Sequence, residues 1–236
     1  MTRDEVSARI REIAIIPAIR ATSGPDAHFA AEAVTRSGIP IVEITMTVPG
    51  AVELMAHLVK SDPKVVVGAG TVLETDTARL CMDAGVSFIT APSLNPEIVE
   101  FAAKNKIVVL PGALTPTEVV TAWRAGADFV KVFPCGPVGG EKYIRALHAS
   151  LPQIPLIAAG GVNQQTAAQF ILSGATAIGI GTELIPTEAI LRRQSQRVHE
   201  LARRFIKLVK EARDQITAWK QSQVVKKYSE KEKCED

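Results

Sequence analysis

The stretch DFVKVF (residues 128–133) is a short run rich in β-branched and aromatic residues, the composition typical of a buried β-strand. Similar apolar runs recur along the chain. In order, the runs are IAIIPAI (13–19), PIVEITM (40–46), KVVVGA (64–69), VSFITA (86–91), IVVL (107–110), DFVKVF (128–133), PLIAA (155–159) and TAIGI (176–180). The sequence therefore predicts eight strands.

Longer segments with helical periodicity separate these runs. Examples are DAHFAAEAVTRSG, TDTARLCMDAG, NPEIVEFAAKN and TPTEVVTAWRAG, which open with Asp, Asn or Thr caps. Apolar strands alternating with helices indicate a parallel sheet covered on both faces. In a chain of 236 residues, eight such units fit a closed α/β barrel of the (β/α)₈ type. The open dinucleotide-binding sheet is the alternative, but GAGTVL (68–73) does not complete its GxGxxG fingerprint.

Both ends of the chain carry charged amphipathic segments. MTRDEVSARIREI (1–13) lacks the apolar centre of a signal peptide and predicts an N-terminal helix. A run of about 18 apolar residues, long enough to span a membrane, does not occur. We therefore expect a soluble, cytoplasmic protein that does not associate with membranes.

Beyond Pro186 the sequence has an apolar stripe at spacings of three, four or seven residues, which predicts an extended C-terminal helix packed on the barrel. The stripe consists of Leu191, Val198, Leu201, Phe205, Leu208 and Ala212. Residues 1–220 are then one barrel domain. The segment QSQVVKKYSEKEKCED (221–236) is too polar to bury much surface, so we expect a frayed tail with Cys234 exposed.

Charge and cysteine content exclude several classes of function. The 27 basic and 25 acidic side chains are interspersed, which gives no electrostatic case for binding nucleic acid. Three cysteines without CxxC spacing and four scattered histidines match neither a disulfide framework nor a metal-ligand motif. We expect no protein-built metal site.

A lysine at position 131 of a buried strand costs free energy, because a buried ammonium must be paired or neutralised. Side chains alternate along a strand, so Phe129, Lys131 and Phe133 share one face. Val130 and Val132 share the other face and suit the surface that the helices cover. Lys131 is therefore expected inside the barrel.

Glu43 and Arg20 are predicted to lie near this lysine. Alternation in PIVEITM turns Glu43 inward, and Arg20 ends the first strand, again near the carboxyl ends where barrel enzymes build their active sites. Desolvation and a neighbouring cation both favour a neutral amine, which attacks carbonyl groups. The pattern favours imine chemistry. The alternatives are a structural ion pair for Lys131 and Glu43, and a solvated loop cation for Arg20.

Glycine-rich turns follow the last two predicted strands. AAGGVNQQT (158–166) and IGIGTEL (178–184) lie where (β/α)₈ barrels commonly bind phosphate, and glycines let backbone N–H groups approach an anion. Plain tight turns would have the same composition. Phosphate binding by loops seven and eight is the more specific hypothesis.

Several motifs in consistent order and spacing closely resemble the 2-keto-3-deoxy-6-phosphogluconate aldolases, class I aldolases grouped with 4-hydroxy-2-oxoglutarate aldolase. These motifs are EITMTVP, VGAGTVL, the proline of ITAPSLNP, LPGALTPTE, FVKVFP and GGVN, and the similarity covers roughly residues 10 to 190. The resemblance implies that Lys131 forms the Schiff base and that Glu43 is the general acid/base. Family members are usually trimers and use no cofactor, so we expect a homotrimer without cofactors.

The resemblance also implies a substrate pocket. The positions that match the lining of the pyruvyl pocket are Arg20, Thr71, Pro92 and Phe133. The positions that match the phosphate cradle are Gly160, Gly161, Gly181 and Thr182.

Two residues depart from the family pattern. Thr47 stands where many members have an arginine, and Ala159 stands where threonine is common. The missing hydroxyl at Ala159, another position on the substrate pocket, leaves the preferred epimer open. The resemblance thus implies a lyase that cleaves 2-keto-3-deoxy-6-phosphogluconate, or its galactonate epimer, to pyruvate and glyceraldehyde 3-phosphate. A 4-hydroxy-2-oxoglutarate aldolase, an isomerase acting on a phosphorylated sugar, and a barrel that binds a metabolite without turnover are the alternatives.

Overall fold

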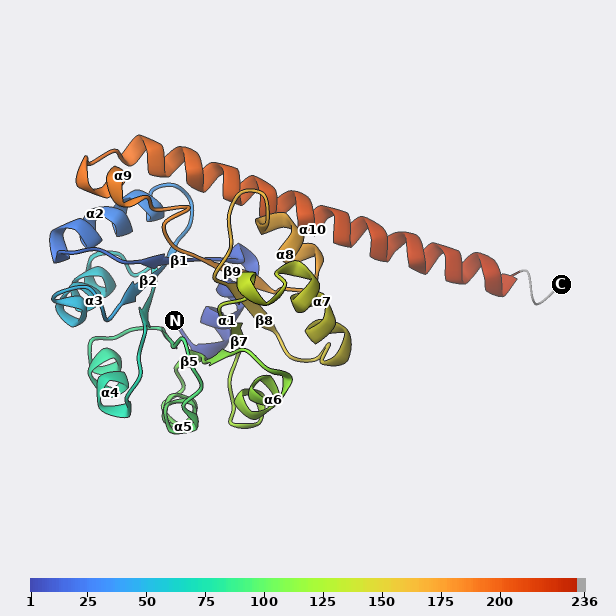
Figure 1. Ribbon diagram of the computed structural model, residues 1–236, viewed down its shortest axis with the longest axis horizontal. Helices are drawn as coiled ribbons and strands as arrows, with labels where there is room; N and C mark the ends of the chain where they lie inside the picture. Colours follow the sequence, from blue (N-terminus) through green and yellow to red (C-terminus); the bar gives the residue numbers. More distant parts are fainter. Residues whose placement is uncertain (233–236) are drawn as a thin grey trace.

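The computed structural model describes residues 1–232, which form a barrel of parallel strands surrounded by helices (Figure 1). The paired strands are parallel throughout this region, in the order β5-β4-β3-β2-β1-β9-β8-β7-β6. The strands are β1 (Ile15–Ile19), β2 (Ile41–Thr45), β3 (Val66–Gly70), β4 (Phe88–Thr90), β5 (Val108–Leu110), β6 (Gly112–Ala113), β7 (Val130–Val132), β8 (Leu156–Ala159) and β9 (Ala177–Ile180). The predicted barrel architecture is confirmed.

The fifth predicted strand is divided into β5 and β6 by Pro111, so residues 1–232 contain nine strands where eight are expected. Pro111 has no amide N–H to donate to a ladder, although its carbonyl accepts from the Lys131 amide at 2.9 Å. β5 pairs with β4 on one side, and β6 pairs with β7 on the other. The ring of strands therefore closes through the chain itself at Pro111.

Helices cover the outside of the barrel, as the alternating pattern predicts (Figure 1). They are α2 (Gly24–Thr35), α3 (Ala51–Ser61), α4 (Thr75–Asp83), α5 (Pro96–Lys104), α6 (Pro116–Arg124), α7 (Glu141–Ser150), α8 (Ala167–Leu172) and α9 (Thr187–Leu191), with a short 3₁₀ turn at Gly136–Val138. Asn95 and Thr115 cap α5 and α6 with their side chains. None of the helices described in residues 1–232 combines the length and apolar character needed to cross a membrane.

Helix α1 (Arg3–Ile13) packs against the N-terminal end of the barrel. A capping box of Thr2 and Glu5 starts the helix, and Val6 and Ile10 are buried. Arg3 forms an ion pair of 2.8 Å with Asp128, directly before β7. This end of the barrel is thus covered, which leaves the carboxyl ends of the strands as the open mouth.

Helix α10 (Ser195–Glu232) crosses α8 and α2 and then extends beyond the barrel (Figure 1). Val198, Phe205 and Ala212 are buried as predicted, and Leu201 and Leu208 are half-buried. Leu191 was expected on the same stripe, and this prediction is wrong, because it lies at the end of α9 with 62% of its surface exposed. The left-handed residue Arg193 (φ 52°) separates the two helices, so their faces are out of phase.

The polar segment after residue 220 continues α10 as far as Glu232, whereas its composition predicted a frayed tail. Residues 221–223 are exposed, consistent with the low burial expected of this segment. Cys234, for which exposure is predicted, lies outside the described residues.

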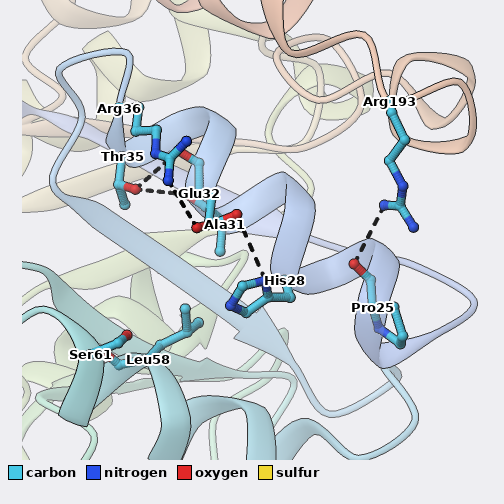
Figure 2. Close-up of polar contacts among 9 residues, drawn as sticks. All are labelled: Pro25, His28, Ala31, Glu32, Thr35, Arg36, Leu58, Ser61 and Arg193. Atoms are coloured by element: carbon cyan, nitrogen blue, oxygen red, sulfur yellow. Dashed lines mark hydrogen bonds and ion pairs between the residues drawn. The ribbon is translucent and has the colours of Figure 1, made fainter.

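Polar contacts attach α2 to the segment between α9 and α10 (Figure 2). Arg193 donates to the Pro25 carbonyl at 3.4 Å and forms an ion pair of 2.8 Å with Asp26. At the C-terminal end of α2, Glu32 pairs with the capping residue Arg36 at 3.2 Å. These contacts lie on the outside of the barrel and leave its interior to the site described next.

Candidate active site

A cavity of about 320 Å³ opens at the carboxyl ends of the strands. It is lined by Ala18, Arg20, Glu43, Lys131, Phe133, Ala159, Gly160, Gly161, Val162, Asn163, Gly179, Ile180, Gly181, Thr182 and Glu183. The strands β1, β2, β7, β8 and β9 contribute to its wall. The inward face of the barrel thus meets loops seven and eight at one mouth, the arrangement typical of barrel enzymes.

Lys131 and Glu43 face each other at the base of the cavity. The Lys131 Nζ lies 3.7 Å from Oε1 of Glu43, and the two side chains are only 9% and 3% exposed. Lys131 Nζ also donates a hydrogen bond of 3.0 Å to Oγ1 of Thr90. Oε1 of Glu43 is buried and has no hydrogen-bond partner among the described residues. A buried amine therefore lies beside a carboxylate oxygen that is free to handle a proton.

Glycine residues on β3 make room for these inward side chains. Gly70 is paired with Thr45 on β2, and a Cβ atom at Gly70 would lie 2.2 Å from Oε1 of Glu43. A Cβ atom at Gly68 would lie 2.2 Å from the ring of Phe88. The GAG sequence at the end of β3 is thus required by the neighbours that fill the barrel interior.

The Gly160–Gly161 turn packs directly on the chain that follows β7. Both glycines have positive φ angles, 77° and 94°, and a Cβ atom at Gly161 would lie 2.8 Å from the Cα atom of Gly136. Gly136 N–H donates to the Gly160 carbonyl at 2.7 Å. These two glycines are therefore required by backbone packing, independently of any bound anion.

Loops seven and eight carry backbone N–H groups on residues that line the cavity. Among residues 1–232, the amide N–H groups of Gly161, Val162, Thr182 and Glu183 have no protein acceptor. The Asn163 side chain accepts from the Thr166 amide at 3.0 Å, which fixes the turn after Val162. The loops thus present N–H groups suited to an oxyanion such as phosphate.

Arg20 supplies a positive charge at the mouth of the cavity. Its side chain extends from the end of β1 towards loop eight, since a Cβ atom at Gly181 would lie 3.4 Å from Nη1 of Arg20. Unlike Lys131, Arg20 is exposed. Arg20 therefore places a positive charge on the wall of the cavity beside loop eight.

A cysteine also lies close to the cavity, but its protonation argues against a role as nucleophile. Cys135 is fully buried, and its Sγ lies 3.2 Å from the Gly160 carbonyl. Burial raises the pKa of the Cys135 thiol to about 11, so the thiol stays protonated near neutral pH. Lys131 remains the candidate nucleophile of the site.

The structure brings most of the sequence-predicted site residues to one cavity. Arg20, Glu43, Lys131, Phe133, Ala159, Gly160, Gly161, Gly181 and Thr182 all line it. Thr71 and Pro92 are not on its wall. Thr71 has a positive φ of 61° at the end of β3, and the backbone of Pro92 packs against Gly112, the β6 partner of Lys131. A contact of Thr71 or Pro92 with substrate stays a prediction.

Sequence reasoning missed Thr90 and Asn163. Thr90 follows Phe88 by two residues in VSFITA, so the alternation that turned Lys131 inward also predicts an inward hydroxyl there. Nothing in the sequence identified the amine as its partner, because β4 and β7 are not adjacent in the strand order. The sequence identified Asn163 only as a residue that caps a helix.

The fold and the site together define an enzyme of the parallel α/β-barrel class, with a buried lysine and a carboxylate at the mouth. The model of the family "KDPG and KHG aldolase" matches residues 6–201 of this chain. The chain therefore belongs to the KDPG and KHG aldolase family and, like its relatives, is a lyase.

This chain aligns with nearly the whole length of relatives that are named as aldolases. The 2-dehydro-3-deoxy-6-phosphogalactonate aldolase of Escherichia coli K12 is 32% identical over 203 residues, 85% of this chain and 97% of the relative. The 2-dehydro-3-deoxy-phosphogluconate aldolase of Haemophilus influenzae is 26% identical over 210 residues, 89% of this chain and 99% of the relative.

Solved structures of aldolases share the fold. A structure described as native KDPGal superposes with a TM-score of 0.76 at 32% identity and covers 85% of this chain and 96% of that one. The KDPG aldolase from Legionella pneumophila, with pyruvate captured at low pH as a covalent carbinolamine intermediate, has a TM-score of 0.78 at 27% identity, with 84% and 96% coverage. The aldolase architecture extends through the whole barrel.

Proposed function

We propose that this chain cleaves a 2-keto-3-deoxy-6-phospho-sugar acid, the gluconate compound or its galactonate epimer, to pyruvate and glyceraldehyde 3-phosphate through a Schiff base on Lys131. The observation that carries this proposal is the buried Lys131 amine 3.7 Å from the Glu43 carboxylate at the barrel mouth. The covalent pyruvate adduct of the Legionella relative supports the same chemistry for this chain.

In the proposed reaction, the neutral Lys131 amine attacks the C2 ketone, and loss of water gives a protonated imine. The C3–C4 bond then breaks. Its electrons move into the imine to give an enamine, while the C4 hydroxyl proton passes to Glu43 directly or through water. Glyceraldehyde 3-phosphate leaves, the enamine is protonated at C3, and water hydrolyses the imine to release pyruvate and the free amine.

The surrounding residues suit the substrate's two anionic ends. The N–H groups of Gly161, Val162, Thr182 and Glu183, which have no acceptor among the described residues, form the proposed phosphate cradle. Arg20 supplies positive charge for an anionic group of the substrate. One bound substrate molecule would place its ketone at Lys131 and its phosphate in the cradle.

A coupled assay tests this proposal. Pyruvate release is followed with lactate dehydrogenase while the gluconate substrate, the galactonate epimer and unphosphorylated 4-hydroxy-2-oxoglutarate are compared. We expect turnover of the phosphorylated substrates, with 4-hydroxy-2-oxoglutarate slower because it leaves the loop amides without a phosphate. Faster turnover of 4-hydroxy-2-oxoglutarate would favour that aldolase activity instead. Absence of pyruvate from all three would favour a barrel without aldolase turnover.

We also propose that the chain assembles as a homotrimer, as the family resemblance implies. Light scattering of the purified protein measures the mass directly. A mass of one or two chains would contradict the trimer.

A further inference from the structure

The reactive amine of Lys131 has its closest polar partner in Thr90 rather than in Glu43. Thr90, at the end of β4, is only 1% exposed, and its Oγ1 accepts the hydrogen bond from Nζ at 3.0 Å. The Glu43 oxygen lies farther away, at 3.7 Å, and has no hydrogen-bond partner within residues 1–232. The hydroxyl therefore holds the amine short of a direct hydrogen bond to the carboxylate.

The backbone of Thr90 is held from both sides, so its hydroxyl has a defined position. Its carbonyl accepts from the Val72 amide at 3.2 Å, and it pairs with Leu110 on β5. The left-handed conformation of Thr71 turns the chain after β3 so that Val72 reaches this carbonyl. A side chain fixed in this way can orient a flexible lysine.

We infer that Thr90 is a positioning residue for imine formation, which keeps the Lys131 amine aimed into the cavity and apart from Glu43. This inference rests on the proposed Schiff-base function. Without the hydroxyl, the nearest polar acceptor for the amine is Glu43. A small movement from 3.7 Å then closes a direct charge-assisted hydrogen bond. Such a bond pins the nucleophile and occupies the oxygen that is needed for proton transfer.

The test measures the rate of borohydride trapping with pyruvate in variants at this position. Thr90→Val removes the hydroxyl and keeps the shape, Thr90→Ala removes it without a branched side chain, and Thr90→Ser retains it. Thr35→Val is the control, because it removes a half-buried hydroxyl that bonds within α2 to the Ala31 carbonyl, outside the barrel (Figure 2). Varying the pyruvate concentration separates weaker binding from slower reaction.

We expect Thr90→Val and Thr90→Ala to lower the limiting trapping rate roughly 10- to 100-fold, the range for a hydrogen bond to a charged group. The half-saturating pyruvate concentration should change much less. Thr90→Ser should stay within about threefold of the parent chain, and Thr35→Val should match it. Retention of the parental melting temperature in the Ser or Ala variant keeps the comparison valid if the Val variant folds poorly.

Two outcomes would overturn the inference alone. Trapping of both hydroxyl-free variants at the parental rate would remove any role for Thr90, and loss of trapping in Thr90→Ser as severe as in Thr90→Val would assign the effect to packing. Failure of the parent chain itself to be trapped with pyruvate would instead overturn the proposed function, and this inference with it.

Discussion

Replacing Glu43 by Gln removes the acid/base group and keeps the volume of the side chain. Glu43 is 3% exposed, and in the part of the chain that the structure describes its Oε1 has no hydrogen-bond partner, so the change alters charge and proton capacity with little repacking. We expect kcat to fall roughly 10²- to 10⁴-fold, the usual contribution of a positioned acid or base. The KM should change little, because the loop amides and Arg20 are untouched.

The same change removes the carboxylate partner of Lys131, which matters for stability whenever the amine is protonated in the resting enzyme. Leaving one charge of a buried pair without its partner costs about 3–5 kcal/mol. Here Lys131 keeps its 3.0 Å hydrogen bond to Thr90 and faces a cavity. We therefore expect a loss of at most about 2 kcal/mol, or a fall in Tm of about 4–8 °C for a domain of this size.

The assay is pyruvate release coupled to lactate dehydrogenase, with a thermal melt of each variant. Glu32→Gln is the matched control, because the same substitution falls on a partly exposed residue of α2 that pairs with Arg36 outside the barrel (Figure 2). An unchanged kcat in Glu43→Gln would refute the acid/base role and leave Glu43 as the lysine's electrostatic partner. Gross unfolding would favour a purely structural ion pair.

Substitutions at three further positions test other parts of the site. Lys131→Ala should abolish pyruvate release in a folded protein, and Lys131→Arg should fail as well, because a guanidinium stays protonated and cannot attack a ketone; substantial residual turnover in either would oppose the imine assignment. Gly181→Val places a side chain towards Arg20 without a positive φ to oppose it, so KM should rise far more for a phosphorylated substrate than for 4-hydroxy-2-oxoglutarate; equal effects would argue against the phosphate cradle. Ala159 offers no hydroxyl, so kcat/KM for the two epimers should agree within about one order of magnitude, and Ala159→Thr should shift the ratio towards gluconate roughly threefold to tenfold; a parental preference of several orders of magnitude would place discrimination elsewhere.

Gly181 is chosen for the substitution because of packing that the sequence did not reveal. Gly160 and Gly161 look equivalent to Gly181 as members of glycine-rich turns. In the structure the first two have positive φ angles and contact the chain after β7, so side chains there disturb the fold. Of these three glycines, Gly181 is the one at which a side chain can probe the cavity without opposing a positive φ.

The barrel was predictable because each strand and helix is specified by local composition and caps. The faces of β2 and β7 were also predictable, since alternation along a strand is a local rule that places Glu43 and Lys131 inward. The split at Pro111 was not, because it depends on the register with both flanking strands. Thr90 was missed for a similar reason: its contact with Lys131 joins strands that meet only across the barrel interior.

The error at Leu191 has a different physical origin. A helical stripe was extended through a segment in which the chain turns at the left-handed residue Arg193. The helical periodicity starts anew after such a residue. Residue spacing counted from α9 therefore does not predict which residues of α10 are buried. Burial therefore resumes at Val198.

Identification of the residue that pyruvate modifies tests the Schiff base most directly. The protein is incubated with pyruvate and borohydride, digested, and its peptides are analysed by mass spectrometry. The account predicts irreversible loss of activity and a carboxyethyl adduct on Lys131, present only when both reagents are added. An unmodified, fully active protein, or an adduct confined to other lysines, would contradict it.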